Sequence, residues 1–293
     1  SFTSAIGSNM RVELLHDSKA TLGEGPVWDA RAQTLFWVDI LNKRIHANAD
    51  PIAELDEYVG CIALRKRGGL ILIKRLSFWT LGLDSASSTF LAAPADESAT
   101  NRFNDGKCDP RGRFLAGTMD MNEKDPTGSL YSFDGNTITK LLSNVTISNG
   151  MTWSPDGKTF YYIDTPTREV KAFDYDVDSG AIANSRAAVT IPASLGWPDG
   201  MTSDSQGNLW IAMWGGAQVT KWNPHTGQLL EQIPVPVIQP SSCVFGGKNM
   251  NELFITSARK DLDDEALSEY PLSGGVFRVE TNVEGLPSFE FAG

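Results

Sequence analysis

The stretch that decides the fold is residues 197–216, WPDGMTSDSQGNLWIAMWGG. It opens with a polar residue followed by glycine, continues into a short strand, turns at a further glycine, and enters a strand of alternating aromatic and aliphatic residues. The same order of features begins at Gly23, Asn104 and Asn149. Recurrence of one such unit along a chain is the signature of a repeat architecture.

Two weaker units, beginning at Gly60 and Ser241, bring the number of repeats to six. The corresponding strands fall near residues 27, 62, 108, 152, 202 and 243, which are 35 to 50 residues apart. This spacing fits the four-stranded blade of a β-propeller. The sequence therefore predicts an all-β fold, a six-bladed β-propeller, with residues 11–293 forming a single domain.

The ends of the chain and its few helical patterns agree with a ring of strands. Residues 11–17, RVELLHD, are expected to add an outer strand to the last blade and so close the ring. Residues 1–10 are expected to be an expression remnant or a disordered N-terminus outside the fold. Helical patterns are scarce, and only DDEALSEY (263–270) is expected to form a helical turn or two. A TIM barrel, the competing fold, needs eight amphipathic helices and is therefore disfavoured.

Charge and cysteine content restrict the partners and the compartment. The formal net charge is −11 and the sequence pI is about 4.8, and an acidic surface repels phosphate backbones and anionic lipid. We therefore expect no nucleic-acid and no membrane partner. Cys61, Cys108 and Cys243 lie in apolar stretches without a C-x-x-C pair, which indicates buried thiols in a reducing compartment. We expect a cytoplasmic protein, a monomer or a weak homo-oligomer.

The polar residue before each glycine is the candidate functional feature. Aligning the repeats on glycine places Glu24, Asp105, Asn149 and Asp199 at one equivalent position, at the mouth of the propeller channel. Asn-Gly and Asp-Gly are also common turn dipeptides, but Glu24 is a poor turn former. Converging carboxylates repel each other unless a cation lies between them, and oxygen ligands suit hard divalent cations. The pattern favours a metal site over a purely structural turn.

At this point the sequence resembles a known family. LGEGPVW (22–28), TNRFNDGKCDPRGRFLAGTM (100–119), ISNGMTWSPDGKTFYYID (147–164) and PDGMTSDSQGNLWIAMWGG (198–216) resemble the gluconolactonase, regucalcin and luciferin-regenerating-enzyme family. The stretch FITSARKDLDDEALSEYPLSGGVFRVE (254–280) is similar to bacterial sugar lactonases of that family. The resemblance implies a six-bladed propeller that holds one divalent cation in its channel.

The resemblance also implies roles for single residues. The cation ligands fall on Glu24, Asn149 and Asp199, and Asp105 matches a position behind the ligands rather than among them. The substrate-contacting pair falls on Arg102 and Asn104.

One family position departs from its usual residue. Regucalcin-like members carry an additional glutamate shortly after GTM, where this chain has Asn122 followed by Glu123. We take Asn122 as a substrate-binding candidate, and Glu123 is the alternative. The oxygen-donor set alone does not distinguish among Ca²⁺, Zn²⁺, Mn²⁺, Mg²⁺ and Fe²⁺.

The resulting functional hypothesis is divalent-metal-dependent hydrolysis of a small-molecule sugar (aldono-)lactone to an aldonic acid in carbohydrate catabolism. Asp199 is the candidate general base, and the cation would polarise the lactone carbonyl. Two alternatives stay open: a related esterase or phosphotriesterase activity, and a calcium-binding propeller without catalysis. Trp197 and Trp214 fit an apolar wall beside a sugar ring, but strand-end tryptophans are more often part of the core, so they are not assigned to the site.

Overall fold

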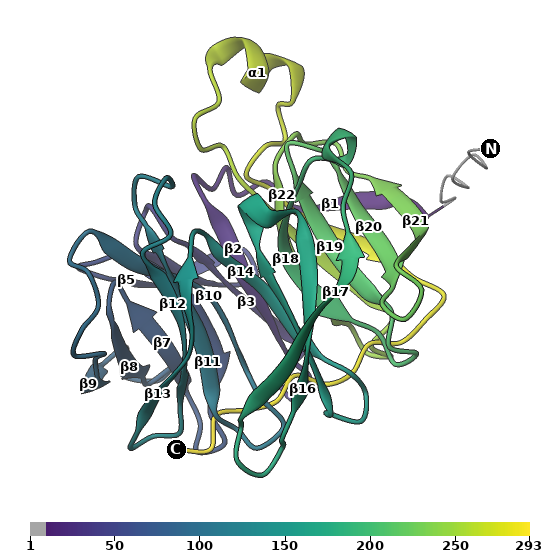
Figure 1. The fold of residues 1–293 in the computed structure, drawn as a ribbon. Helices are drawn as coiled ribbons and strands as arrows, with labels where there is room; N and C mark the ends of the chain where they lie inside the picture. Colours follow the sequence, from purple (N-terminus) through teal and green to yellow (C-terminus); the bar gives the residue numbers. More distant parts are fainter. Residues whose placement is uncertain (1–9) are drawn as a thin grey trace.

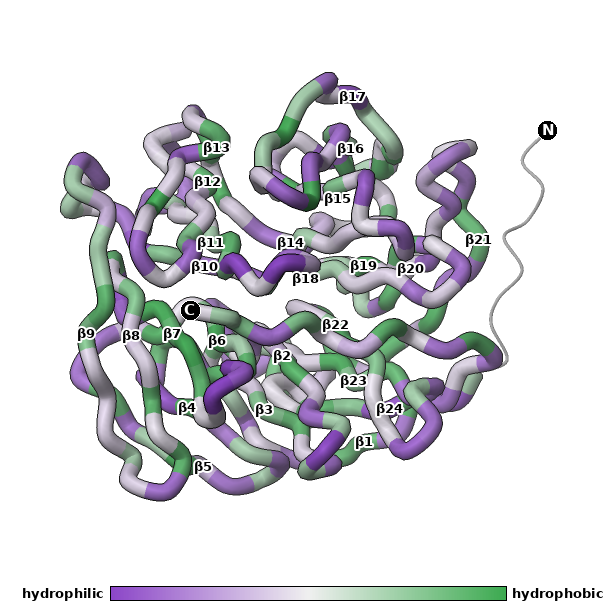
Figure 2. The backbone as a smooth tube through the Cα atoms, turned by 90° about the horizontal axis from the view of Figure 1, so that it is seen from below, coloured by the Kyte–Doolittle hydropathy of each residue, from purple (hydrophilic) through white to green (hydrophobic). Residues whose placement is uncertain are grey.

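The structure is a computed structural model that describes residues 10–293, and it places them in a ring of six antiparallel sheets (Figures 1 and 2). Each sheet has four strands and forms one blade. This confirms the predicted six-bladed β-propeller. Residues 1–10 were expected to lie outside the fold, and residues 1–9 are not among the described residues. The single-domain boundary at residue 11 stays a prediction.

The strands run outward from the channel in each blade. Those of the first three blades are β2 (Gly23–Asp29), β3 (Thr34–Asp39), β4 (Arg44–Ala47), β5 (Asp50–Glu54); β6 (Val59–Leu64), β7 (Leu70–Lys74), β8 (Ser77–Leu81), β9 (Ser88–Ala92); β10 (Asn101–Cys108), β11 (Phe114–Asp120), β12 (Gly128–Phe133) and β13 (Ile138–Val145). Those of the last three are β14 (Ser148–Trp153), β15 (Thr159–Asp164), β16 (Glu169–Tyr175), β17 (Ile182–Thr190); β18 (Trp197–Ser203), β19 (Leu209–Trp214), β20 (Gln218–Asn223), β21 (Gln228–Pro234); β22 (Pro240–Gly246), β23 (Glu252–Ser257), β24 (Val276–Glu280) and β1 (Val12–His16).

The first strand of the chain closes the ring, as the sequence predicted. β1 pairs antiparallel with β24, in a register that sets Val12 against Val279 and Leu14 against Phe277. Arg278 forms an ion pair of 3.2 Å with Glu13 across the same two strands. The first and last strands of the described chain therefore share one sheet, and opening the ring there requires breaking this ladder of hydrogen bonds.

Every inner strand is irregular near its start. The register against the second strand shifts between Glu24 and Val27 in β2, and between Pro198 and Met201 in β18. Equivalent shifts occur in β6, β10, β14 and β22. A bulge bends its strand and re-aims the side chain beside it. The polar–glycine step is therefore a bulge inside a strand and not a turn between strands.

Glycine is required at this step because neighbouring blades approach closely around the channel. A Cβ atom on Gly150 would lie 2.7 Å from the Asp199 carbonyl oxygen of the next blade. A Cβ atom on Gly200 would lie 2.0 Å from Ser242 Oγ, again in the next blade. Real Cβ atoms do not tolerate such distances, so the inner strands can converge only where the side chain is absent.

A C-terminal strap, residues 284–292, covers the opposite end of the channel (Figures 1 and 2). Asp204 forms a β-bridge with Gly285, and Arg65 forms one with Phe291. The Phe291 amide donates to the Leu64 carbonyl at 2.8 Å, and its buried ring stacks on Phe133 with centroids 5.8 Å apart. The strap closes this end of the channel and leaves the other mouth as the entrance.

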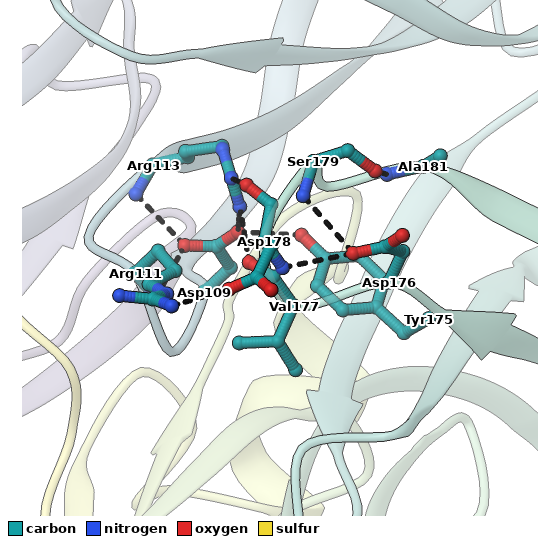
Figure 3. A network of polar contacts seen from close by, with 9 residues as sticks. All are labelled: Asp109, Arg111, Arg113, Tyr175, Asp176, Val177, Asp178, Ser179 and Ala181. Carbon is teal, nitrogen blue, oxygen red and sulfur yellow. Dashed lines mark hydrogen bonds and ion pairs between the residues drawn. The ribbon is translucent and has the colours of Figure 1, made fainter.

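Charged residues join the third and fourth blades on the strap side (Figure 3). Asp109 is fully buried and accepts hydrogen bonds from Arg113 Nη1 at 2.6 Å and from the Tyr175 hydroxyl at 2.5 Å. Arg111 and Arg113 also contact Asp178 of the β16–β17 turn. A buried carboxylate with several donors is fixed in place, so this contact holds the two blades in register.

The short helix α1 (Asp264–Glu269) stands at the end of the ring opposite the strap (Figure 1). The Asp263 side chain caps it by accepting from the Ala266 amide at 2.8 Å, which confirms the predicted turn of helix. No helix within residues 10–293 is long and apolar enough to cross a membrane. The three cysteines are buried and free, as predicted.

We predict that Phe291→Ala will destabilise the propeller by about 3–5 kcal/mol, because it removes a fully buried ring and leaves a cavity. The measurement is the free energy of unfolding in urea. Phe289→Ala is the matched control, since Phe289 lies in the same strap but is 42% exposed, and we expect it to cost about 1 kcal/mol or less. Equal losses in the two variants would show that the strap is not anchored through Phe291.

Candidate functional site

A cavity of about 420 Å³ opens at the mouth of the channel opposite the strap. Its walls are formed where inner strands begin and where second strands return. The residues that line it include Glu24, Arg102, Asn104, Glu123, Asn149, Thr165, Trp197, Asp199, Trp214, Gln239, Lys260 and Asp261. The cavity therefore collects side chains from five of the six predicted repeats, which lie far apart in the sequence.

Glu24 and Asp199 face each other inside this cavity. They are only 4% and 6% exposed, and burial raises the pKa of both carboxyls well above their ordinary values. The neighbouring Asp199 carboxylate raises the pKa of Glu24 further. Two neighbouring buried carboxylates cannot both ionise without a compensating positive charge, so they hold either a proton or a cation.

Asn149 is fixed beside the two carboxylates by a chain of hydrogen bonds. Its Nδ2 atom donates to Thr165 Oγ1 at 2.7 Å, and Thr165 in turn donates to the Pro198 carbonyl at 2.8 Å. Its Oδ1 atom accepts from Asn104 Nδ2 at 2.9 Å. Because an amide oxygen has two acceptor positions, Asn149 Oδ1 still has one available for a further partner.

The donor set fits a hard divalent cation. Asp199 Oδ1 is buried and has no hydrogen-bond partner, which is costly unless another group binds there. With Glu24 and Asn149, it offers two carboxylates and one amide oxygen from three blades. No group of three or more His, Cys, Asp and Glu side chains placed for a metal occurs within residues 10–293, so binding here depends on the amide of Asn149.

Arg102 and Asn104 lie next to the carboxylates, as the sequence analysis expected. Arg102 is 5% exposed, and its Nη1 atom donates to Asn104 Oδ1 at 3.0 Å and to the Phe103 carbonyl at 3.1 Å. Burial lowers the pKa of its guanidinium, and the charges of Glu123 and Glu24 oppose that effect. Arg102 thus directs fixed donors toward the cavity without forming an ion pair of its own.

The structure separates the two candidates that follow GTM. Glu123 lines the cavity and forms an ion pair with Lys260 at 3.1 Å, whereas Asn122 is exposed and is not among the lining residues. The β-turn after β11 places successive side chains in different directions, and Glu123 has a positive φ of 59°. Of the two residues, only Glu123 lies at the cavity, and a substrate contact by either residue stays a prediction.

Asp105 lies behind the cation candidates, at the position expected for it. It lines a narrow cavity on the strap side of the channel together with Lys107, and its Oδ1 atom accepts from the Gly106 amide at 2.8 Å. Burial raises the pKa of Asp105. Its charge raises the pKa of Glu24 as well, so it adds to the negative charge that a cation would offset. Its place behind the ligands stays a prediction.

Several lining residues were not selected from the sequence. Thr165 and Lys260 follow β15 and β23, and the second strand of every blade ends at the mouth where the first begins. This relation between first and second strands follows from the predicted repeats, so the sequence pattern contains a signal that indicates Thr165 and Lys260. The sequence left Trp197 and Trp214 without a place in the site, and both line the cavity.

Comparison with known proteins agrees with this geometry. Residues 22–259 match the family model described as the SMP-30/gluconolactonase/LRE-like region. The chain belongs to this family. Regucalcin from Oryctolagus cuniculus is 38% identical over 300 residues, which cover 98% of this chain and 100% of the relative. Regucalcin from Homo sapiens is 37% identical, with the same coverage.

Solved structures of family members have the same ring. A luciferin-regenerating enzyme superposes with a TM-score of 0.90 at 33% identity, covering 97% of this chain and 100% of that one. A regucalcin from Agrobacterium tumefaciens, described as a calcium-binding protein, gives a TM-score of 0.91 at 26% identity, covering 96% and 97%. A gluconolactonase from Xanthomonas campestris, at 23% identity, 94% and 91% coverage and a TM-score of 0.76, shows the shared fold alone.

We predict that chelator-treated protein loses stability as the pH rises, because the folded chain keeps Glu24 and Asp199 protonated above the pH at which the unfolded chain releases those protons. The loss begins near pH 4 and continues through the raised pKa values, at about 1.4 kcal/mol for each unit by which a pKa is raised. Urea unfolding at pH 5 and pH 8 measures it.

Glu24→Gln should flatten this pH dependence by roughly 1–3 kcal/mol, since it removes one of the two buried carboxyls that titrate. Glu123→Gln is the control, because the Glu123 side chain lies in the same cavity but is 42% exposed. Identical pH slopes for wild type and Glu24→Gln would show that the two carboxylates do not titrate against each other.

Proposed function

We propose that this protein is a divalent-metal-dependent lactonase that hydrolyses sugar (aldono-)lactones to aldonic acids in carbohydrate catabolism. The observation that carries the proposal is the buried Asp199 Oδ1 atom, without a partner, opposite Glu24 and beside Asn149. A binding cavity with fixed donors, Arg102 and Asn104, lies directly against it. Family membership supports a lactonase-type role, because the family includes gluconolactonases.

Glu24, Asn149 and Asp199 would hold the cation. When bound, a divalent cation supplies Lewis-acid polarisation of the lactone carbonyl. The protein's contribution is to keep three oxygen donors fixed: bulges in β2 and β18 aim the carboxylates, and Thr165 and Asn104 hold the Asn149 amide. Because these supports lie in separate blades, the donor set is preorganised by the ring itself.

Asp199 is the general base in this proposal. Its carboxylate lies in the cavity beside the proposed cation, so the oxygen that does not bind the cation is the one that accepts a proton from the water that attacks the lactone carbonyl. Burial raises the pKa of Asp199, which makes its carboxylate a stronger base. The same carboxyl can return the proton to the departing ring oxygen, so the ester opens to an acid and an alcohol.

The remaining polar residues orient the substrate. Arg102 presents guanidinium donors that its two internal hydrogen bonds do not use. On the other side of the cavity, Glu123 is held by Lys260 and accepts hydrogen bonds from hydroxyl groups. A lactone ring with several hydroxyl groups satisfies both sides at once, which favours a sugar lactone over an alkyl or aryl ester.

A calcium-binding role without catalysis is the second candidate, because the solved Agrobacterium tumefaciens regucalcin is described as a calcium-binding protein. The two roles differ in what they require of the cavity. A purely structural cation needs the oxygen donors alone. This cavity also has room for a substrate and contains guanidinium donors of Arg102 that are free to bind one.

We also propose a cytoplasmic location, for which the three buried free thiols are suited.

We predict that Asp199→Asn lowers kcat for aldonolactones by about 10²–10⁴-fold, the usual contribution of a general base. The assay is proton release from a panel of pentono- and hexonolactones, with each of Ca²⁺, Zn²⁺, Mn²⁺, Mg²⁺ and Fe²⁺ added in turn to chelator-treated protein. Wild-type turnover by a folded Asp199→Asn variant would overturn the assignment of Asp199.

The same assay separates the two candidate functions. A lactonase loses turnover with chelator and regains it with a cation. Wild-type protein that is inert on the whole panel, yet melts at a lower temperature after chelation, would instead establish the structural, calcium-binding role. Asp261→Asn is the control for a general loss of negative charge, since Asp261 lines the outer cavity and is exposed.

A further inference from the structure

Trp197 is the most exposed tryptophan of the described chain, with 41% of its surface accessible at the entrance to the cavity. It is the first residue of β18 and pairs in register with Trp214, the last residue of β19. Both tryptophans are among the residues that line the cavity. Large apolar rings exposed together are unfavourable in water and mark binding surfaces.

Arg168 holds the Trp197 ring in place. Its guanidinium carbon lies 3.6 Å from the centroid of the indole, and its Nη1 atom donates to the Gly196 carbonyl at 2.6 Å. Arg168 is not among the residues that line the cavity. The guanidinium therefore braces Trp197 from outside, and the stack fixes the orientation of a ring that its exposure would otherwise leave free.

The segment that carries Arg168 is held by backbone hydrogen bonds and also supports the candidate cation site. Arg168 ends the 3₁₀ helix η1 (Thr165–Thr167) with a positive φ of 55°, and its amide donates to the Thr165 carbonyl at 3.1 Å. The Ile191 amide donates to the Arg168 carbonyl at 2.8 Å. Since Thr165 also holds Asn149, one short segment sets both the tryptophan ring and a cation ligand.

The opposite side of the cavity is polar and already neutralised. Lys260 forms ion pairs with Glu123 at 3.1 Å and with Asp261 at 3.0 Å, and Arg102 lies beside the Glu24 and Asp199 carboxylates. Among the described lining residues, Lys260 is thus already paired with two carboxylates, which disfavours a phosphate or carboxylate substituent on its side of the cavity. An occupant that suits both sides is an uncharged ring with one apolar C–H face and a rim of hydroxyl groups.

We infer that Trp197 is a specificity-determining residue that stacks on the C–H face of the sugar ring, and that Arg168 is its positioning residue. The inference rests on the proposed lactonase function and adds the group that recognises the ring rather than the reacting carbonyl. Stacking binds the ground state and the transition state alike, because the C–H face does not change during hydrolysis. Loss of Trp197 must therefore raise KM and leave kcat nearly unchanged.

The test is the steady-state kinetics of D-glucono-1,5-lactone hydrolysis by cation-loaded protein. Trp197→Ala should raise KM by about 10-fold with kcat changed by less than about 3-fold, as expected for loss of a buried aromatic contact. Trp197→Phe should restore most of the affinity because it keeps an aromatic face. Arg168→Met should raise KM by about 2–5-fold, which corresponds to an exposed cation–π contact.

The chain provides a matched control for the brace. Lys74 lies 3.6 Å from the centroid of Trp79 in the second blade, and neither residue lines the cavity. Lys74→Met removes a cation–π contact of the same geometry elsewhere, so KM should not change. Equal effects of Lys74→Met and Arg168→Met would overturn the positioning role of Arg168.

The outcomes distinguish this inference from the proposed function. An active wild type whose KM is unchanged in Trp197→Ala, or whose kcat falls as much as kcat/KM, overturns the role of Trp197 while the lactonase function stands. A wild type that is inert on this lactone and on the wider panel overturns the proposed function, and the inference with it. If Trp197→Ala does not fold, Arg168→Met tests the inference by the same KM criterion.

Discussion

The structure depends on the close approach of six inner strands around one axis. At Gly150 and Gly200 the backbone of the next blade occupies the space that a Cβ atom would need. The bulge at the same step then turns the preceding polar side chain into the channel. Tight packing and the delivery of functional groups thus have one origin, because the glycine that lets two blades meet also places Asn149 and Asp199 at the channel mouth.

That arrangement gathers negative charge where water is scarce. Glu24 and Asp199 are buried opposite each other with Asp105 close behind, a combination that opposes folding unless a proton or a cation neutralises it. The ring supplies the compensating stability elsewhere, through the β1–β24 closure, the C-terminal strap and the buried Asp109 contact between blades. Stability is therefore concentrated at the closed end and the outer edge, while the strained, chemically useful arrangement occupies the open mouth.

The two sides of the cavity have different roles and are formed by different parts of the chain. Residues on the bulges hold charge and hydrogen-bond donors at its floor, whereas residues at the ends of second strands and in the following loops line its entrance. The segment from Thr165 to Arg168 connects the two, since it supports both Asn149 and Trp197. The positions of Asn149 and Trp197 therefore depend on the same short segment.

The sequence by itself determined the number of blades, the closing strand and the residues at the polar–glycine steps, because each is encoded locally in a pattern that repeats along the chain. It did not determine that these steps are bulges rather than turns, that Glu123 rather than Asn122 reaches the cavity, or that Trp197 is exposed beside Arg168. Those features were decided by the tertiary structure alone. They depend on the direction of a side chain relative to neighbouring blades, and only ring closure fixes the position of one blade against the next.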